Sequence, residues 1–319
     1  MANNEAIQVE LTRSAIESVH LVDAAIVIDG EVTATWGNAA APVIPRSAIK
    51  SIQALPLLES GAAEAFDVTD VELALAMASH SGEPEHIEAV EAWLHRLDLT
   101  RDDLECGVDR PIGLSAADEV LRSGRVFERI HNCCSGKHAG FLTVARHLGI
   151  DPTGYIEPNH PVQGLVVDAV ASATELSFAE QIPGIDGCGI PTYSMPVSAL
   201  ARAIGSLTTP HDASRQRIVE TGNAHPWWVS GTGRHEVTLI EASNEPMMLK
   251  TGAEGVFVAA LNDRRMGIAC KARDGATRAA EVAISWILHE LGAISSDPLV
   301  RPIVNKAGDH VGQQRVAAQ

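Results

Sequence analysis

The first part of the chain alternates apolar and polar side chains in the way that β-strands do. Residues 7–11 alternate, and residues 19–28 and 32–36 flank an Asp29-Gly30 turn signal, which is typical of a β-hairpin. Short runs rich in β-branched and small apolar residues return late in the chain, where the expected strands are 247–251, 255–261 and 266–272. The pattern predicts an antiparallel sheet assembled from both ends of the chain.

The middle of the chain repeats its apolar residues every three to four positions, which is the period of an amphipathic helix. Pro84 and Pro161 suit the first turn of a helix, and Gly149 suits a helix end. The predicted helices span residues 47–59, 70–78, 84–97, 115–121, 135–148 and 161–173, with a further amphipathic helix at 277–291.

Strands at both ends of a helical middle predict an α+β fold, in which helices pack on an antiparallel sheet and a helical region is inserted between the strands. We expect a single domain over residues 1–319, with the helical region at roughly residues 60–230. The tail after Ser295 is rich in Gly, Asp and Gln, and we expect it to be loosely ordered.

The composition is that of a globular protein with a large core, because 45% of the 319 residues are hydrophobic. The formal net charge of −17 disfavours nucleic acids and anionic membranes as partners, so we expect a small-molecule substrate. The N-terminal residues lack a basic segment with a long apolar run, and no segment has the roughly eighteen apolar residues of a membrane helix. Five cysteines, an odd number, favour reduced thiols. We expect a cytoplasmic protein.

Ser47 and Lys50 are the first candidate catalytic pair. They are three residues apart at the start of a predicted helix, so they share one face, and a lysine amine there can take the proton of the serine hydroxyl. A Ser-x-x-Lys spacing also fits a helix cap followed by a solvated lysine. Ser79-His80-Ser81 and Lys250-Thr251-Gly252 follow in the chain order of the motifs of serine β-lactamases and penicillin-binding proteins, with His80-Ser81 in place of Asp-Asn.

A second cluster of reactive side chains lies in two loops. Cys133 and Cys134 lead into a predicted helix that also carries His138, and Cys188 stands in a glycine-flanked turn. Ligand chemistry alone favours zinc held by Cys134, His138 and Cys188, whereas the spacing fits no known zinc motif. Buried, unreactive thiols are the alternative.

Six motifs in order make the chain similar to a known family. They are Arg46-Ser-Ala-Ile-Lys50, Ala78-Ser-His-Ser-Gly-Glu83, Asn132-Cys-Cys-Ser-Gly-Lys-His138, Asn159-His-Pro-Val-Gln-Gly164, Asp186-Gly-Cys-Gly-Ile-Pro191 and Lys250-Thr-Gly-Ala-Glu-Gly255. Together they span most of the chain and resemble the Rhizobium etli-type L-asparaginases, or L-asparaginase II family. The resemblance implies hydrolysis of L-asparagine to L-aspartate and ammonia, a serine β-lactamase-like fold and a homodimer.

The resemblance also implies the residues of the site. It implies two Ser-Lys tandems, Ser47 with Lys50 and Ser79 with Lys250. It implies one zinc ion per subunit, held by Cys134, Lys137 and Cys188 with a water molecule, so that Lys137 replaces His138 as the expected ligand. We expect this zinc to position the substrate rather than to activate water.

Two charged residues beside these motifs are expected to hold the substrate. Asp186 looks placed to bind the α-amino group of asparagine, and Arg46 to bind its α-carboxylate, although a surface salt bridge also explains an arginine there. Three other functions remain open: hydrolysis of glutamine, a lactam-hydrolysing or penicillin-binding-like acylase, and a non-catalytic metal-binding protein on the same scaffold.

Overall fold

The computed structural model describes residues 2–3, 5–295 and 300–317. The described chain forms two compact units. A sheet unit comprises residues 1–48, 194–209 and 238–319, and a helical unit comprises residues 49–193 and 210–237. The helical unit therefore interrupts the sheet unit in sequence, as the predicted inserted region does, but it begins earlier and lets residues 194–209 return to the sheet unit.

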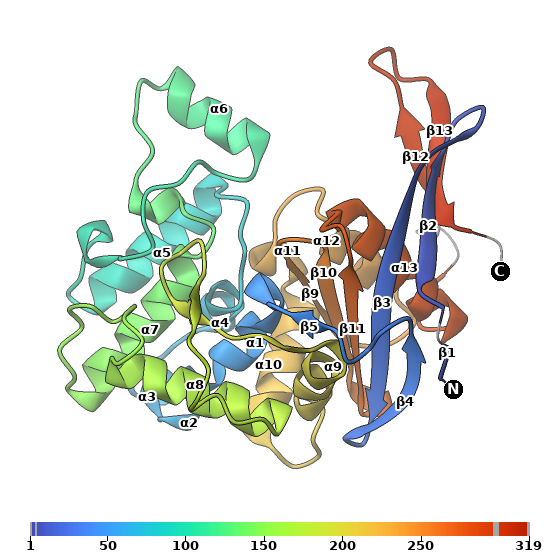
Figure 1. The fold of residues 1–319 in the computed structure, drawn as a ribbon. Coiled ribbons are helices and arrows are strands. Elements are labelled where there is room, and N and C mark those ends of the chain that lie inside the picture. The colour runs from blue at the N-terminus through green and yellow to red at the C-terminus, as the bar shows by residue number, and fades with distance from the viewer. Residues whose placement is uncertain (1, 4, 296–299, 318–319) are drawn as a thin grey trace. The chain divides into compact units, whose positions relative to one another are not determined.

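The sheet unit is built on an antiparallel sheet, which confirms the predicted α+β class (Figure 1). Among the described residues the strand order is β12-β13-β2-β3-β11-β10-β9, with β4 paired to β3 and β1 to β4. The strands are β1 (Ala2–Asn3), β2 (Ile7–Thr12), β3 (Ile16–Ile28), β4 (Glu31–Trp36), β9 (Met247–Gly252), β10 (Val256–Leu261), β11 (Met266–Ala272), β12 (Arg301–Val304) and β13 (His310–Val316). A separate short pair joins β5 (Pro42–Val43) to β8 (Met195–Pro196).

Two helices cover opposite faces of this sheet. Helix α13 (Thr277–Glu290) buries its apolar face against alternate strand residues that include Ile26, Ile268 and Cys270. Helix α9 (Val197–Ser206) packs on the other face, at Gly267 of β11, where a Cβ atom would lie 2.2 Å from the carbonyl oxygen of Ala201. A short 3-10 helix, η4 (Asn262–Arg264), joins β10 to β11.

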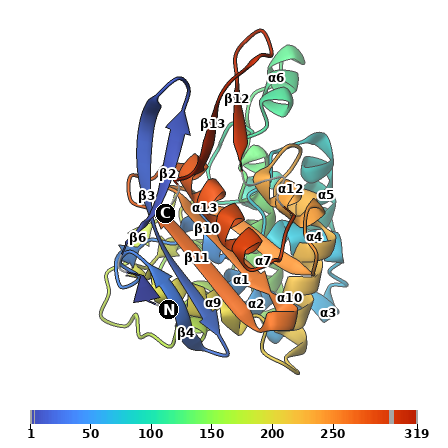
Figure 2. The ribbon, with the colours of Figure 1, turned by 90° about the vertical axis from the view of Figure 1, so that its right-hand side faces the viewer.

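The C-terminal segment is more ordered than its composition predicts. Strands β12 and β13 pair with each other, and β13 pairs with β2, so the two hairpins lie side by side (Figures 1 and 2). Val316 packs against the core of the sheet unit. The expectation of a loosely ordered tail is thus corrected for residues 301–316, because tertiary pairing orders a segment with little local preference; residues 296–299 lie outside the described residues.

The helical unit contains short and long helices around one buried helix. In chain order they are α1 (Lys50–Gln53), α2 (Leu55–Glu59), α3 (Ala62–Ala65), α4 (Asp70–Ala76), α5 (Pro84–Arg96), η2 (Arg101–Asp103), α6 (Leu114–Arg122), η3 (Arg129–His131), α7 (Ser135–Leu148), α8 (Pro161–Thr174), α10 (Ala213–Ala224) and α11 (Pro226–Val229). Every residue of α7 from Ser135 to Ala145 is buried, and Gly136 lets α4 approach, since a Cβ atom there would lie 2.5 Å from the carbonyl oxygen of Leu75.

Two elements carry the chain from one unit into the other, η1 (Arg46–Ile49) and α12 (His235–Glu241). The continuous helix predicted for residues 47–59 is therefore wrong, because it is divided among η1, α1 and α2. Pro56 explains the break before α2, since it has no N–H for an α-helical hydrogen bond. No helix in the described part of the chain is long and apolar enough to cross a bilayer.

Candidate active site

Lys50 is the centre of a buried polar group in the helical unit. Its side chain is fully buried, and its Nζ atom lies 2.9 Å from the Ser79 Oγ atom and 3.1 Å from the Cys134 Sγ atom. The same amine donates a hydrogen bond to the carbonyl oxygen of Ala78. The structure thus joins a residue of the first predicted motif to a serine of the second and a cysteine of the third.

The loop that carries Ser79 is held by its backbone. It follows α4, and the amide of Ser79 donates to the carbonyl oxygen of Val229 at 3.0 Å. The next amide, of His80, donates to the carbonyl oxygen of Cys133 at 3.1 Å. Backbone hydrogen bonds therefore fix the serine motif beside the cysteine motif, 54 residues further along the chain.

His80 adds a side-chain link between the same two loops. Its Nδ1 atom accepts a hydrogen bond from the amide of Gly82 at 3.1 Å, so the proton is on Nε2, which donates to the Ser135 Oγ atom at 2.9 Å. Burial, with neighbouring His86, holds the pKa of His80 well below its usual range. His80 is consequently a neutral imidazole that orders the loop rather than an acid or base at neutral pH.

The buried histidines predict that stability falls in mild acid. Burial lowers the pKa of both His80 and His86 in the folded chain, whereas a histidine in the unfolded chain titrates near 6.5. Below about pH 6.5 the unfolded chain therefore binds more protons, and the free energy of unfolding should fall by up to about 1.4 kcal/mol per pH unit for each histidine. Urea unfolding between roughly pH 7 and pH 5 measures this slope. His80→Gln should flatten it, and an unchanged slope would contradict the assignment.

Two cysteines and a lysine gather in the same buried group. The Lys137 Nζ atom lies 3.2 Å from the Cys188 Sγ atom, and Cys134 and Cys188 each shift the pKa of the other. Hydrogen bonds from Cys133 and Cys188, with the charges of Lys50 and Lys137, hold the pKa of Cys134 well below its usual range. Its bond to Cys134, together with burial, raises the pKa of Cys188. The pKa values of the two thiols are therefore shifted in opposite directions, and Cys134 is the more acidic of the two.

Lys137 is charged in this environment. Burial alone would lower its pKa, but Cys188, Cys134 and Asp186 outweigh burial and raise the pKa above its usual value. The neutral amine that a metal ligand requires is therefore not favoured by the protein alone. Binding of a cation would have to displace this proton.

His138 lies one residue after Lys137 on α7 and is also buried. Its Nδ1 atom lies 2.7 Å from the hydroxyl of Tyr155, which accepts a hydrogen bond from the amide of Glu105. Its Nε2 atom is buried and has no hydrogen-bond partner in the described part of the chain. The sequence analysis did not identify Tyr155 or Ser135 as functional residues. Ser135 lies within the Asn132–His138 motif, whereas no sequence pattern indicated a role for Tyr155.

Cys188 and Asp186 share a tight turn between β6 (Gly184–Ile185) and β7 (Pro191–Thr192). The amide of Gly189 donates to the carbonyl oxygen of Asp186, and Gly189 has a φ angle of +91°, which favours glycine. Asp186 is half-buried. The turn therefore fixes a carboxylate two residues from the thiol that reaches Lys137.

The remaining predicted residues belong to the sheet unit. Arg46 has a φ angle of +52°, an uncommon backbone conformation for a residue other than glycine, directly before Ser47 in η1. Lys250 is buried on β9 and donates to the carbonyl oxygen of Thr251. Gly252 lies against the Ser47 turn, since a Cβ atom there would be 2.6 Å from the carbonyl oxygen of Pro45. The glycine thus lets the strand that carries Lys250 pass close to the backbone around Ser47.

Lys137 and the side chains around it include three potential zinc ligands. Within the described residues, no group of three or more His, Cys, Asp and Glu side chains is arranged to hold a metal ion. Cys134 and Cys188 provide two sulfur donors, of which Cys134 has the lowered pKa, and Lys137 is the third potential donor beside them. Two sulfurs and one amine in one buried group fit zinc by their chemistry, provided that the amine loses its proton.

Comparisons with known proteins assign a family and similar folds. Residues 9–316 match the family model described as L-asparaginase II. Similar solved structures include a β-lactamase from Mycobacterium bovis, with 17% identity over 86% of this chain and 95% of that chain and a TM-score of 0.43. A β-lactamase from Burkholderia ambifaria has 16% identity over 86% of this chain and 96% of that chain, with a TM-score of 0.40.

A third similar structure is an octameric penicillin-binding protein homologue from Pyrococcus abyssi. It has 14% identity over 84% of this chain and 73% of that chain, with a TM-score of 0.43. Structural similarity at these TM-scores carries no argument about function. The search of curated protein sequences gave no match.

Proposed function

The chain belongs to the L-asparaginase II family and is a hydrolase of that class, and from this premise we propose that it converts L-asparagine to L-aspartate and ammonia through a serine that a lysine activates. The observation that carries the proposal is the buried contact of 2.9 Å between the Lys50 amine and the Ser79 hydroxyl. A lysine held in this way can exchange a proton with a serine without contact with bulk water.

Ser47 is proposed as the nucleophile because it lies in η1, three residues before Lys50 at the start of α1. In the molecules whose Lys50 amine is neutral, this amine takes the proton of Ser47, and the Ser47 oxygen attacks the side-chain amide carbon of asparagine. The carbon–nitrogen bond then breaks, and the proton reaches the departing ammonia from Lys50 through Ser79. Water finally cleaves the resulting ester and releases aspartate. The Lys50–Ser79 contact thus serves as the proton path to the leaving group.

We propose that the other predicted residues assist proton transfer or bind the substrate. Lys250 is proposed to assist proton transfer with Ser79, as the resemblance implies. Arg46 is proposed to bind the α-carboxylate of the substrate and Asp186 its α-amino group, since opposite charges are what a zwitterionic substrate requires. The homodimer and the cytoplasmic location remain proposals that rest on the family resemblance and on the sequence.

Zinc is proposed at Cys134, Lys137 and Cys188. When bound, the ion would supply a positive charge that positions the substrate. The protein's own contribution is the lowered pKa of Cys134, which favours the deprotonated sulfur that a metal ligand requires. Asp186, which is proposed to bind the substrate amine, lies only two residues before Cys188. The proposed zinc site and the proposed amine site are therefore adjacent in the sequence.

If zinc only positions the substrate, Cys188→Ala should raise KM at least tenfold and lower kcat by less than about threefold, since an interaction that is equal in ground and transition states changes KM alone. Steady-state kinetics and metal analysis of the same samples measure both effects. Cys270→Ala, which removes a buried thiol of β11 in the sheet unit, is the matched control. Loss of kcat at unchanged KM would place zinc in the chemical step. If the wild-type protein contains no metal and Cys188→Ala has no effect on the kinetics, the protein has no zinc site at these residues.

An ammonia-release assay with asparagine, glutamine and a chromogenic lactam tests the proposed function against its alternatives. We expect release from asparagine with a kcat/KM at least about a hundredfold above that for glutamine, and no lactam hydrolysis. Lactam turnover without ammonia release would favour the acylase alternative. If the protein binds zinc but neither releases ammonia nor hydrolyses the lactam, the result favours a non-catalytic metal-binding protein.

A further inference from the structure

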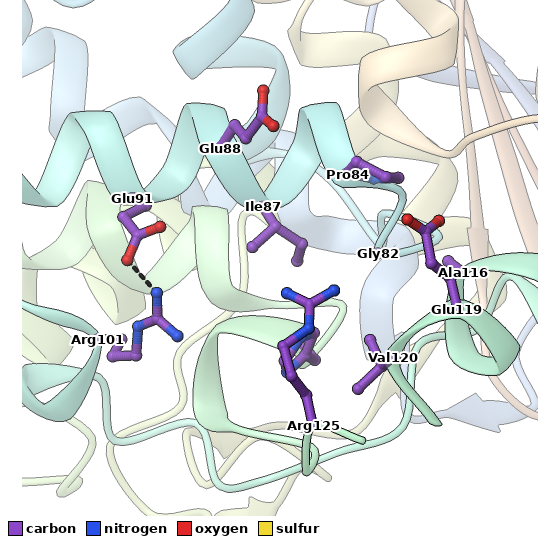
Figure 3. A pocket seen from close by; sticks show the side chains of 11 residues that line it. Gly82, Pro84, Ile87, Glu88, Glu91, Arg101, Ala116, Glu119, Val120 and Arg125 are labelled. Carbon is purple, nitrogen blue, oxygen red and sulfur yellow. Dashed lines mark hydrogen bonds and ion pairs between the residues drawn. The ribbon is translucent and has the colours of Figure 1, made fainter. Parts of the chain in front are cut away.

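A cavity of about 320 Å³ lies in the helical unit, apart from the group around Lys50 (Figure 3). Its walls come from α5, α6, the segment after α6, and the 3-10 helices η2 and η3. Pro84, Ile87, Ala116 and Val120 supply apolar surface. Cavities of this size that combine apolar walls with a few charged groups are typical of small-molecule sites.

Some of the charged groups in the cavity neutralise one another, and others do not. Arg101 forms ion pairs with Glu91 and Glu128, so its charge is satisfied. The guanidinium of Arg125 reaches into the cavity toward Ile87, while the Glu119 carboxylate lies on the neighbouring wall (Figure 3). Arg125 donates to the Ser123 hydroxyl through Nε, and within the described residues neither Arg125 nor Glu119 forms an ion pair.

His131 supplies a ring N–H donor to the same cavity. The residue is 3% exposed, and its Nδ1 atom accepts a hydrogen bond from the amide of Glu128 at 2.9 Å, which places the proton on Nε2. This Nε2–H group has no protein acceptor in the part of the chain that the structure describes, and the side chain lines the cavity. A neutral N–H donor beside a guanidinium is suited to a carboxylate.

We propose that this cavity binds a neutral aliphatic α-amino acid in its zwitterionic form, with the carboxylate at Arg125 and His131, the ammonium at Glu119, and the side chain against Ile87 and Val120. Opposite charges that face one cavity without pairing are complementary to a ligand that carries both charges. A purely anionic ligand would meet the carboxylates of Glu88 and Glu119 in a chain whose net charge is −17.

The cavity shares loops with the candidate active site. Gly82 lines it three residues after Ser79, and His131 lines it three residues before Cys134. A ligand here would therefore contact both of the loops that His80 links, although it would not contact the proposed catalytic residues.

Calorimetric titration with L-leucine tests the proposal. Wild-type protein should bind leucine saturably with a Kd below about 5 mM, whereas N-acetyl-L-leucine, which lacks the ammonium, and L-leucinamide, which lacks the carboxylate, should each bind at least about tenfold more weakly. Arg125→Gln and Glu119→Gln should each weaken leucine binding by a similar factor. Arg122→Gln, an exposed arginine of α6 outside the cavity, is the matched control and should leave the Kd within about twofold.

Two results would overturn the proposal. Absence of saturable leucine binding to wild-type protein up to roughly 20 mM would remove the site, whatever the variants do. An unchanged Kd in Arg125→Gln would show that leucine occupies another site, such as the proposed substrate site at Arg46 and Asp186. The KM for asparagine, measured in parallel, should be unchanged in both arginine variants, which separates this proposal from the proposed function.

Discussion

Replacing Ser47 by alanine is expected to lower kcat for asparagine at least about a thousandfold, because the acyl-enzyme cannot form without the attacking oxygen. Binding should persist, since the proposed contacts of Arg46 and Asp186 with the substrate are untouched. Steady-state ammonia release and a binding titration with asparagine measure the two effects separately.

Ser51→Ala provides the matched control for this variant. Ser51 lies four residues further along the chain, in α1. Its buried hydroxyl has no hydrogen-bond partner in the described part of the chain, so its removal should cost little stability or activity. If Ser47→Ala keeps a tenth or more of the wild-type kcat, which is a barrier change of only about 1.4 kcal/mol, Ser47 is not the nucleophile.

Lys50→Met is expected to have an effect of similar size on kcat, at least about a thousandfold, because it keeps the length of the side chain and removes the base. It also removes the charge that lowers the pKa of Cys134 and leaves the carbonyl of Ala78 without this donor. Circular dichroism and urea unfolding should show a folded but less stable protein. Lys306→Met, at an exposed position between β12 and β13, controls for the loss of one lysine charge.

The wild-type pH profile supplies a second readout of the lysine base. A lysine acts as a base only after it loses its proton, so kcat/KM should rise with pH between about pH 6 and pH 9. A flat profile over this range would contradict a lysine base, even if Lys50→Met is inactive for structural reasons.

The sequence predicted those helices and strands whose boundaries are set by residues close to them in the chain. Helix α7 has the predicted bounds because a helix-length apolar pattern ends at Gly149 in a left-handed conformation. Strands β9, β10 and β11 lie within about one residue of their predictions. Helix α10 was not predicted, since its apolar residues are few and its start depends on the Asp212 side chain, which accepts a hydrogen bond from the amide of Arg215.

The site was harder to predict because its contacts join residues that are far apart in sequence. Spacing pairs Ser47 with Lys50, yet the serine that hydrogen-bonds to Lys50 in the structure is Ser79, 29 residues away. Similarly, the bond from His80 to Ser135 depends on how α4 packs against α7 through Gly136. Such contacts are consequences of packing, which no local pattern encodes. The assignment of catalytic, substrate-binding and zinc-binding residues stays a prediction.

Rapid acid quenching of the enzyme during turnover of L-asparagine, followed by peptide mass mapping, identifies the residue that forms the acyl-enzyme. The peptide containing Ser47 should carry an aspartyl ester that is absent in Ser47→Ala and that disappears once the substrate is exhausted. An ester on the peptide that contains Ser79, or steady ammonia release with no ester on any peptide, would contradict the proposed nucleophile and its acyl-enzyme.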